Sequence, residues 1–301
     1  MSRNVSLAIA LKLAQTLAFS LMYAAIKLAG AVPIGQVVFY RGFFALVPLL
    51  AWTFFTVGPA AAIKTQRPAY HVIRAVVGVS SMFANFTALK LLALATVTAF
   101  GFMQPIFAVV LAALFLRERV GRYRWGAVVV GFAGVLLMIE PHGGLASLVG
   151  LHLSSGVGYA LLFSFLSAVV VVWIRQMSTT ERSEAIVFYF MAASAAVGAA
   201  VMIWDRVPLS FDQVFWLVMC GLTGGLGQIF MTYSYRYAEP SLLASFDYVS
   251  MVWATLLGYF VFAEVPAAMV FAGAGVVIAA GMFIAWREHH LHVERPPAAV
   301  T

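Results

Sequence analysis

Charged side chains are rare inside the long apolar stretches of this sequence, and Asp247 is the only carboxylate that falls well within one of them. A charge buried in an apolar medium is costly, so it needs an oppositely charged partner or a functional role. Asp247 could bind a proton or the ammonium group of a substrate, and the alternative is a buried structural pair. The sequence favours neither interpretation.

Arg74, Gly78, Ser81 and Asn85 follow one another at steps of four, three and four residues. This spacing places all four on one face of a helix. A polar face that includes glycine, on an otherwise apolar helix, is expected to face a cavity or another helix. Arg74 and Asp247 have opposite charges and fall in the same half of the membrane, so we expect them to lie within reach of each other. The alternative is that Arg74 extends to the membrane interface.

Other charged residues lie nearer the ends of the apolar stretches. Lys27 and Arg41 could bind an anionic group, or they could extend to the interface or bond to a helix C-terminus. Lys12 is expected to extend to the inner interface. Glu118 and Glu264 each fall where one apolar stretch ends and another begins, so we interpret them as partners of unpaired helix amide groups rather than as an acid–base pair.

Aromatic and amide side chains complete a candidate binding wall. An aromatic stripe is more often packing than a binding surface, but an indole in the middle of a span, as at Trp253, needs a partner for its N–H group. The candidate substrate-binding residues are Tyr23, Lys27, Arg74, Ser81, Asn85, Phe100, Met103, Tyr159, Phe163, Gln228, Asp247, Tyr248 and Trp253.

Patterns for catalysis and metal binding are missing from the sequence. It has no HExxH motif, no aspartate-rich pair and no Ser/His/Asp set within the apolar stretches. Cys220 is the only cysteine, which excludes a thiolate metal cluster, and the three histidines at 289, 290 and 292 are typical of a solvated tail. The sequence contains no Walker A motif, so we do not expect this chain alone to drive export with ATP. We therefore expect no enzymatic activity, no metal and no cofactor.

Composition indicates that these residues are positioned by membrane helices. Of the 301 residues, 63% are hydrophobic and 10% are charged, and the mean hydropathy is +0.98. A soluble domain carries roughly 25% charged residues, so the apolar surface of this chain is expected to face a lipid bilayer. The net charge of +7 does not indicate a nucleic-acid partner, because the basic residues lie at the ends of the apolar runs and form no single basic face.

Apolar runs of about 20 residues predict ten transmembrane helices, each long enough to cross a core of roughly 30 Å. Most basic residues gather at one set of run ends, whereas the opposite set carries Lys90 and Arg206, so both termini are expected to be cytoplasmic. We expect residues 287–301 to form a disordered cytoplasmic tail. The predicted spans are 5–28, 36–57, 69–89, 93–116, 122–139, 151–174, 184–204, 213–235, 239–262 and 265–286.

An internal repeat divides the chain into two halves. Shifting the sequence by 146 residues lays Ala93–Arg119 over Glu239–Val265, so that Glu118 falls on Glu264, and one helix earlier Gly78 falls on Gly224. Five helices is an odd number, so the halves must insert with opposite orientations, as in many secondary transporters. We expect residues 1–140 to form the first five-helix repeat and residues 151–286 the second.

Several of these features resemble the EamA-type family of drug/metabolite transporters. Leu21–Leu50 resembles the opening of that family through Lys27, Pro33 and Arg41. The repeat ends are also similar, with a Pro105-bearing helix, Leu116-Arg-Glu118 and then Gly126, Gly131 and Gly134 in the first copy, and Glu264, Gly273, Gly275 and Gly281 in the second. The second copy has Met251 in place of the proline. Members of the family include amino-acid exporters of the YddG type, so the resemblance implies amino-acid export across a bacterial inner membrane.

The sequence thus predicts an all-α, multi-pass membrane protein that acts as a secondary transporter of small metabolites, most readily amino acids, by alternating access. The helices at 5–28, 69–89, 93–116, 151–174, 213–235 and 239–262 are expected to enclose a central cavity, with 122–139 and 265–286 packed outside it. We expect a monomer. Alternatives are a carrier of organic anions or nucleotide sugars, which the excess of basic over acidic groups favours, and, with less support, an integral membrane enzyme.

Overall fold

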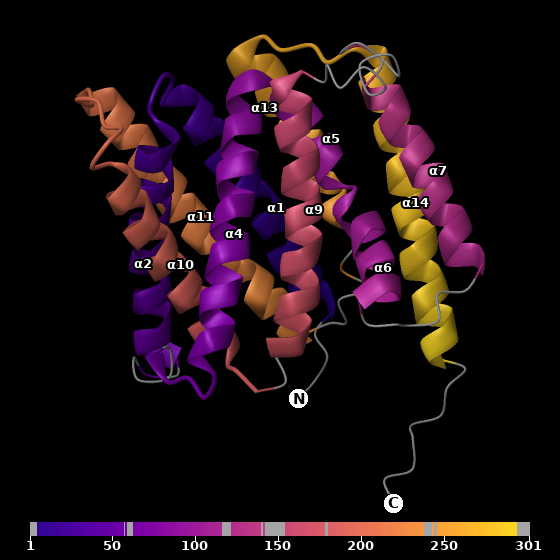
Figure 1. Ribbon diagram of the computed structural model, residues 1–301, viewed down its shortest axis with the longest axis horizontal. Helices are drawn as coiled ribbons and strands as arrows, with labels where there is room; N and C mark the ends of the chain where they lie inside the picture. Colours follow the sequence, from indigo (N-terminus) through magenta and orange to yellow (C-terminus); the bar gives the residue numbers. More distant parts are fainter. Residues whose placement is uncertain are drawn as a thin grey trace, which may run out of the picture.

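The computed structural model describes residues 5–56, 58, 63–115, 122–139, 141, 154–177, 180–237, 243 and 246–293, and these residues form helices with no β-strand among them (Figure 1). Helices satisfy their own backbone hydrogen bonds, which is why apolar runs in lipid adopt them. In chain order the elements are α1 (Val5–Leu28), α2 (Ile34–Thr56), α4 (Pro68–Leu91), α5 (Leu94–Gly101), α6 (Gln104–Phe115), α7 (Arg122–Ile139), α9 (Ser155–Met177), α10 (Ser183–Val201), α11 (Phe211–Tyr237), α13 (Val249–Phe262) and α14 (Ala268–Val293).

The long apolar helices agree with the predicted membrane character. Among the described residues, α1, α2, α4, α9, α10 and α11 are the six helices long and apolar enough to cross a membrane. Shorter apolar helices occupy the other four predicted positions, within 94–108, 125–139, 249–262 and 268–283. The multi-pass membrane class is therefore supported, while the count of ten spans stays a prediction.

Two of the predicted spans are interrupted. The run expected as one helix over 93–116 consists of α5 and α6, separated by a turn at Phe102 and Met103. The proline at position 105 explains the break, because a proline has no N–H group to donate to the carbonyl group four residues earlier in the chain. The run expected over 239–262 has a turn at Tyr248, just before α13, although no proline follows it there.

The C-terminal helix is longer than expected. We predicted a disordered tail from residue 287, but α14 continues to Val293. No glycine or proline interrupts the sequence from Arg287 to Val293, so nothing in it ends the helix at the predicted boundary. Residues 294–301 lie outside the described part of the chain, as do Glu118 and most of the link between the two predicted repeats.

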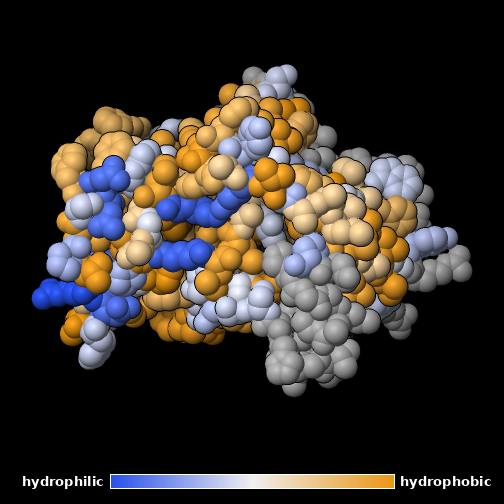
Figure 2. Space-filling model, turned by 90° about the horizontal axis from the view of Figure 1, so that it is seen from above, coloured by the Kyte–Doolittle hydropathy of each residue, from blue (hydrophilic) through white to orange (hydrophobic). Residues whose placement is uncertain are grey.

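Helices from one half of the chain pack mainly against helices from the other half. At one edge α7 packs against α14, and toward the opposite edge α2 packs against α10 (Figure 1). Between these pairs α1 packs on α11, α4 packs on α9, and α5 packs on α13. The start of α1 and the end of α14 lie at the same end of the bundle. From the opposite end, Figure 2 shows short hydrophilic stretches between broad hydrophobic areas.

Glycines let the helix pairs at both edges approach closely. A Cβ atom added to Gly134 of α7 would lie 2.8 Å from the carbonyl oxygen of Gly273 in α14. In the other pair, a Cβ atom on Gly42 of α2 would lie 2.6 Å from the backbone nitrogen of Ala195 in α10. Small residues at such contacts allow backbones to meet in a membrane, where van der Waals packing drives helix association. These close contacts hold each of the two edge pairs together.

Candidate functional site

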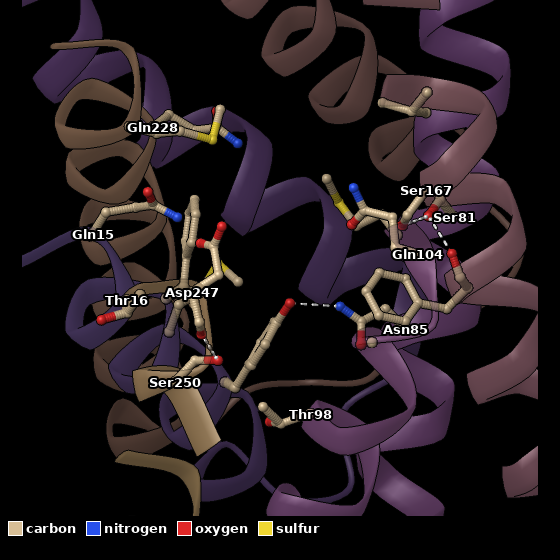
Figure 3. Close-up of a pocket in the computed structure, with 18 of the residues that line it drawn as sticks. Gln15, Thr16, Ser81, Asn85, Thr98, Gln104, Ser167, Gln228, Asp247 and Ser250 are labelled. Atoms are coloured by element: carbon tan, nitrogen blue, oxygen red, sulfur yellow. Dashed lines mark hydrogen bonds between the residues drawn. The ribbon is translucent and has the colours of Figure 1, made fainter. Parts of the chain in front are cut away.

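A cavity of about 410 Å³ lies among the central helices. Among the described residues, its lining comes from α1, α2, α4, α5, α6, α9, α10, α11 and the start of α13, with no contribution from α7 or α14. Gln15, Thr16, Asp247 and Ser250 lie on one side, across from Ser81, Asn85, Gln104 and Ser167 (Figure 3). The cavity therefore has the position expected from the sequence, with added contributions from α2 and α10.

Seven of the thirteen candidate residues line this cavity. They are Tyr23, Arg74, Ser81, Asn85, Phe163, Gln228 and Asp247. Several of these side chains are held by neighbours from other helices. Asn85 donates through Nδ2 to the Tyr23 hydroxyl oxygen at 2.9 Å, and the Ser81 hydroxyl lies 2.9 Å from that of Ser167. These contacts connect α4 with α1 and α9 at the cavity wall, while the Asn85 Oδ1 atom has no hydrogen-bond partner.

Asp247 pairs with Lys12, not with Arg74 as we predicted. The Lys12 Nζ atom lies 2.7 Å from Oδ1 of Asp247, and the two side chains are 1% and 42% exposed. The prediction that Lys12 extends to the interface is therefore also wrong. A buried ammonium group is most readily tolerated beside a carboxylate, and α1 places Lys12 against the one acidic residue that the described residues contribute to the cavity lining.

Arg74 lies inside the bundle instead of extending to the interface. It is 8% exposed, and its guanidinium carbon is 4.0 Å from the ring centroid of Phe190 in α10. Gly78, one turn further along α4, leaves room for this side chain, because a Cβ atom there would collide with Arg74 Nη1 and lie 2.8 Å from the Phe190 ring. The polar face predicted for this helix therefore provides the space that the Arg74 guanidinium group occupies.

Arg41 of α2 also lines the cavity and is 2% exposed. Its Nη1 atom contacts the Sδ atom of Met191 at 2.6 Å. Gly224 of α11 leaves space beside it, since a Cβ atom at that position would lie 3.0 Å from Arg41 Nε. Each of the two cavity arginines is therefore accommodated by a glycine.

The other candidate residues lie outside the cavity lining. Phe100 and Met103 are fully buried in the hydrophobic core, and Tyr159 is 40% exposed on the outer surface of α9. Tyr248 packs edge-to-face against Phe102, with ring centroids 5.1 Å apart. Trp253 donates its indole N–H to the Thr16 hydroxyl oxygen at 3.3 Å, which supplies the partner that we expected for this indole.

Lys27 lies in a cluster of polar contacts at one end of the bundle. Its ammonium group pairs with Glu264 and donates to the carbonyl oxygen of Leu92 at 3.0 Å. The second oxygen of Glu264 accepts the backbone N–H of Leu94 at 2.9 Å, at the start of α5. The interpretation of Glu264 as a partner for helix amide groups is confirmed. This cluster ties α1 to α5 and to the α13–α14 link at the end of the bundle where α1 ends.

Glu181, in the loop before α10 at the opposite end of the bundle, also accepts backbone N–H groups. Its Oε1 atom accepts the backbone N–H groups of Gln66 and Arg67 at 2.9 and 2.8 Å, before the start of α4, and its Oε2 atom lies 3.3 Å from His71 Nε2. Burial raises the pKa of Glu181, but these hydrogen bonds outweigh it and leave the pKa below its ordinary value. The loop before α10 is thereby fastened to the start of α4.

Our sequence reasoning missed several polar residues of the lining, among them Lys12, Gln15, Thr98, Gln104, Ser167 and Ser250. A signal for part of this set was present. Lys12, Thr16, Phe19 and Tyr23 follow one another at steps of four, three and four residues, the same spacing as the face of α4. In the described residues no group of three or more His, Cys, Asp or Glu side chains could hold a metal ion.

Helices of this length and apolarity define a multi-pass membrane protein. A model of the EamA-like transporter family matches residues 6–140 and again residues 154–286. The chain therefore belongs to the EamA-like transporter family, within the drug/metabolite transporter superfamily.

Curated relatives cover most of the chain. The pseudopaline exporter CntI of Pseudomonas aeruginosa is 29% identical over 87% of this chain and 90% of its own length. An S-adenosylmethionine uptake transporter of Rickettsia felis is 26% identical over 84% and 83%, and a riboflavin transporter of Rhizobium johnstonii is 28% identical over 79% and 76%. A solved crystal structure with 20% identity aligns over 95% of this chain and 99% of its own, with a TM-score of 0.65, which shows a shared fold. The relatives are transporters of small molecules with dissimilar substrates.

Proposed function

We propose that this protein is a secondary transporter that carries small metabolites through its central cavity by alternating access. The observation that supports this most directly is the cavity itself, which polar and charged side chains from several helices line in part, inside a bundle of apolar helices. Polar side chains at membrane depth are costly, so a cluster of them from several helices indicates a path for a polar solute. No catalytic set accompanies them in the described residues, and we propose no enzymatic activity.

We further propose that the two family matches are inverted repeats. The turn at Phe102 and the turn at Tyr248 are 146 residues apart, the same shift that relates Gly78 to Gly224. The packing of α1 on α11 also has its counterpart under this shift in the packing of α4 on α9. Alternating access then follows from one repeat moving against the other around the shared cavity.

The proposed location is the bacterial inner membrane, with both termini in the cytoplasm. Bacterial relatives and the asymmetry of basic residues support it. In a variant with Ser210→Cys, an impermeant thiol reagent added outside intact cells should label the protein, and in one with Gln66→Cys it should not. Cys220 is buried and should contribute little background. Labelling of Gln66→Cys alone would contradict the orientation.

Amino acids are the substrates that we propose first, and export is the proposed direction. A substrate carboxylate would meet Arg74, and the Asp247 carboxylate, 42% exposed, would accept the ammonium group beside Lys12. Organic anions and nucleotide sugars are the second class, favoured by the two cavity arginines. The test is uptake and efflux in proteoliposomes with labelled amino acids and anions. Movement of at least one of these solutes above the rate of empty liposomes is expected, and movement of none would overturn the proposed function.

A further inference from the structure

Two arginine side chains from different helices converge on the cavity wall. Arg41 of α2 contacts Met191, and Arg74 of α4 stacks on Phe190. Phe190 and Met191 are consecutive residues of α10, so the same helix contacts both guanidinium groups. The positive charge of Arg41 acts unfavourably on the charged form of Arg74. Apolar side chains could pack at this position without the cost of burying two like charges, so packing alone does not explain the two arginines.

Neither guanidinium group has a full set of partners. The Nε atom of Arg41 and the Nε and Nη1 atoms of Arg74 are buried, and their N–H groups donate to no hydrogen-bond partner in the described residues. No carboxylate in that part of the chain lies within ion-pair distance of either arginine. The ring of Phe190 covers one face of the Arg74 group, but a ring face does not satisfy the N–H groups in the guanidinium plane.

The cavity therefore carries an excess of positive charge. In the described part of the chain, its lining contains Lys12, Arg41 and Arg74 but only one acidic residue, Asp247, and that residue is paired with Lys12. Two buried positive charges without counterions are strongly unfavourable in an empty apolar bundle. A bound anion removes this cost, and a guanidinium fork binds the paired oxygens of carboxylates and phosphates.

We propose that Arg41 and Arg74 bind the substrate of this transporter, and that the substrate carries two negative charges on carboxylate or phosphate oxygens. The inference rests on the proposed function and, of the two substrate classes named there, selects the anions over the amino acids, as small dicarboxylates or phosphate esters of a size that fits about 410 Å³. Gly78 and Gly224 keep the space in which the two side chains turn toward the solute. Gln15 and Ser250, which also line the cavity, then contact the uncharged part of the substrate.

The test is equilibrium binding to the purified protein in lipid nanodiscs. The probes are labelled succinate, 2-oxoglutarate, glycerol 3-phosphate and glucose 6-phosphate, with L-leucine and L-lysine for comparison. At least one dianion should bind more tightly than both amino acids. Arg41→Gln and Arg74→Gln should each weaken that binding by about 30-fold or more, since each removes one partner of a buried charge pair. Arg41→Lys and Arg74→Lys should weaken it less, and Arg206→Gln, at an exposed position, should leave it unchanged.

The outcomes separate this inference from the proposed function. Preference for the dicarboxylates or for the phosphate esters supports the inference and identifies the oxyanion. Binding and transport of L-leucine or L-lysine, without binding of any dianion, overturns the inference and leaves the transporter assignment intact. Unchanged dianion affinity in a folded Arg41→Gln, Arg74→Gln double variant also overturns it. If the glutamine variants do not fold, the wild-type preference and the lysine variants still decide the matter.

Discussion

Replacing Asp247 by Asn removes the negative charge that faces the buried ammonium group of Lys12. The Lys12 side chain is 1% exposed, and its Nζ atom lies 2.7 Å from the carboxylate. In the variant, the ammonium group keeps its charge without a counterion, or it loses its proton at a cost in free energy. Either outcome lowers the stability of the folded protein.

The expected size of the loss follows from the exposure of the two side chains. Breaking a fully buried ion pair by removing one partner costs about 3–5 kcal/mol. Asp247 is 42% exposed toward the cavity, so water that enters there compensates part of the lost interaction. We therefore expect Asp247→Asn to lower the free energy of unfolding by about 3 kcal/mol. Lys12→Gln in the same background removes the orphaned charge and should restore most of that stability, with a coupling energy of about 2 kcal/mol.

The assay is unfolding by SDS titration in mixed micelles, followed by tryptophan fluorescence. The wild type, the two single variants and the double variant form a complete cycle. A matched control combines Asp247→Asn with Arg74→Gln, which should not restore stability because Arg74 is not the partner of Asp247. Unchanged stability in Asp247→Asn, or rescue by Arg74→Gln in place of Lys12→Gln, would refute the reasoning.

Three further perturbations have defined outcomes. Because its pKa is lowered by folding, Glu181 stabilises the protein above its ordinary pKa of 4.5, and this stabilisation is lost as the pH falls below that value. Thermal unfolding between pH 6 and pH 3.5 should accordingly depend less on pH in Glu181→Gln, and an unchanged pH profile would argue against it. Gly78→Ala should displace the Arg74 guanidinium group and reduce transport in proteoliposomes. The control Gly126→Ala, where an added Cβ has nothing within 4 Å, should leave transport unchanged. Equal transport rates in the two variants would show that Gly78 is not needed to accommodate Arg74. Glu264→Gln should loosen the end closed by Lys27, so that a cysteine introduced at Thr98 reacts faster with an impermeant reagent added outside, and equal labelling rates would show that the cluster closes nothing.

The helices were the most predictable part of this protein, because apolar runs and terminal charges are local signals. The break before α6 could also be anticipated from Pro105, whereas the turn at Tyr248 could not, since no proline accompanies it. The extension of α14 past residue 286 was missed because the end of an apolar run is not the end of a helix. A helix continues into water as long as its residues permit it.

The partners of the charged residues were harder to predict than their positions. Sequence spacing gives the face of a helix, so the polar face of α4 was recognised, but it does not say which helix packs against that face. Arg74 stacks on Phe190, and Asp247 meets Lys12, because α10 and α1 are brought there by the packing of the whole bundle. Depth along the helix suggested that Lys12 reaches the interface. The Lys12 side chain points toward Asp247 because of tertiary contacts between helices, which the sequence alone does not show.

Filling the cavity tests the central claim, that the cavity is the path of the transported solute. Ser81→Trp places an indole in the lining, and Val129→Trp places the same side chain on an exposed position of α7, 67% exposed and outside the lining. Counterflow of the best solute in reconstituted vesicles should be abolished in Ser81→Trp and unchanged in Val129→Trp, with both variants folded and inserted. Full counterflow in a folded Ser81→Trp protein would contradict the assignment of this cavity as the transport path.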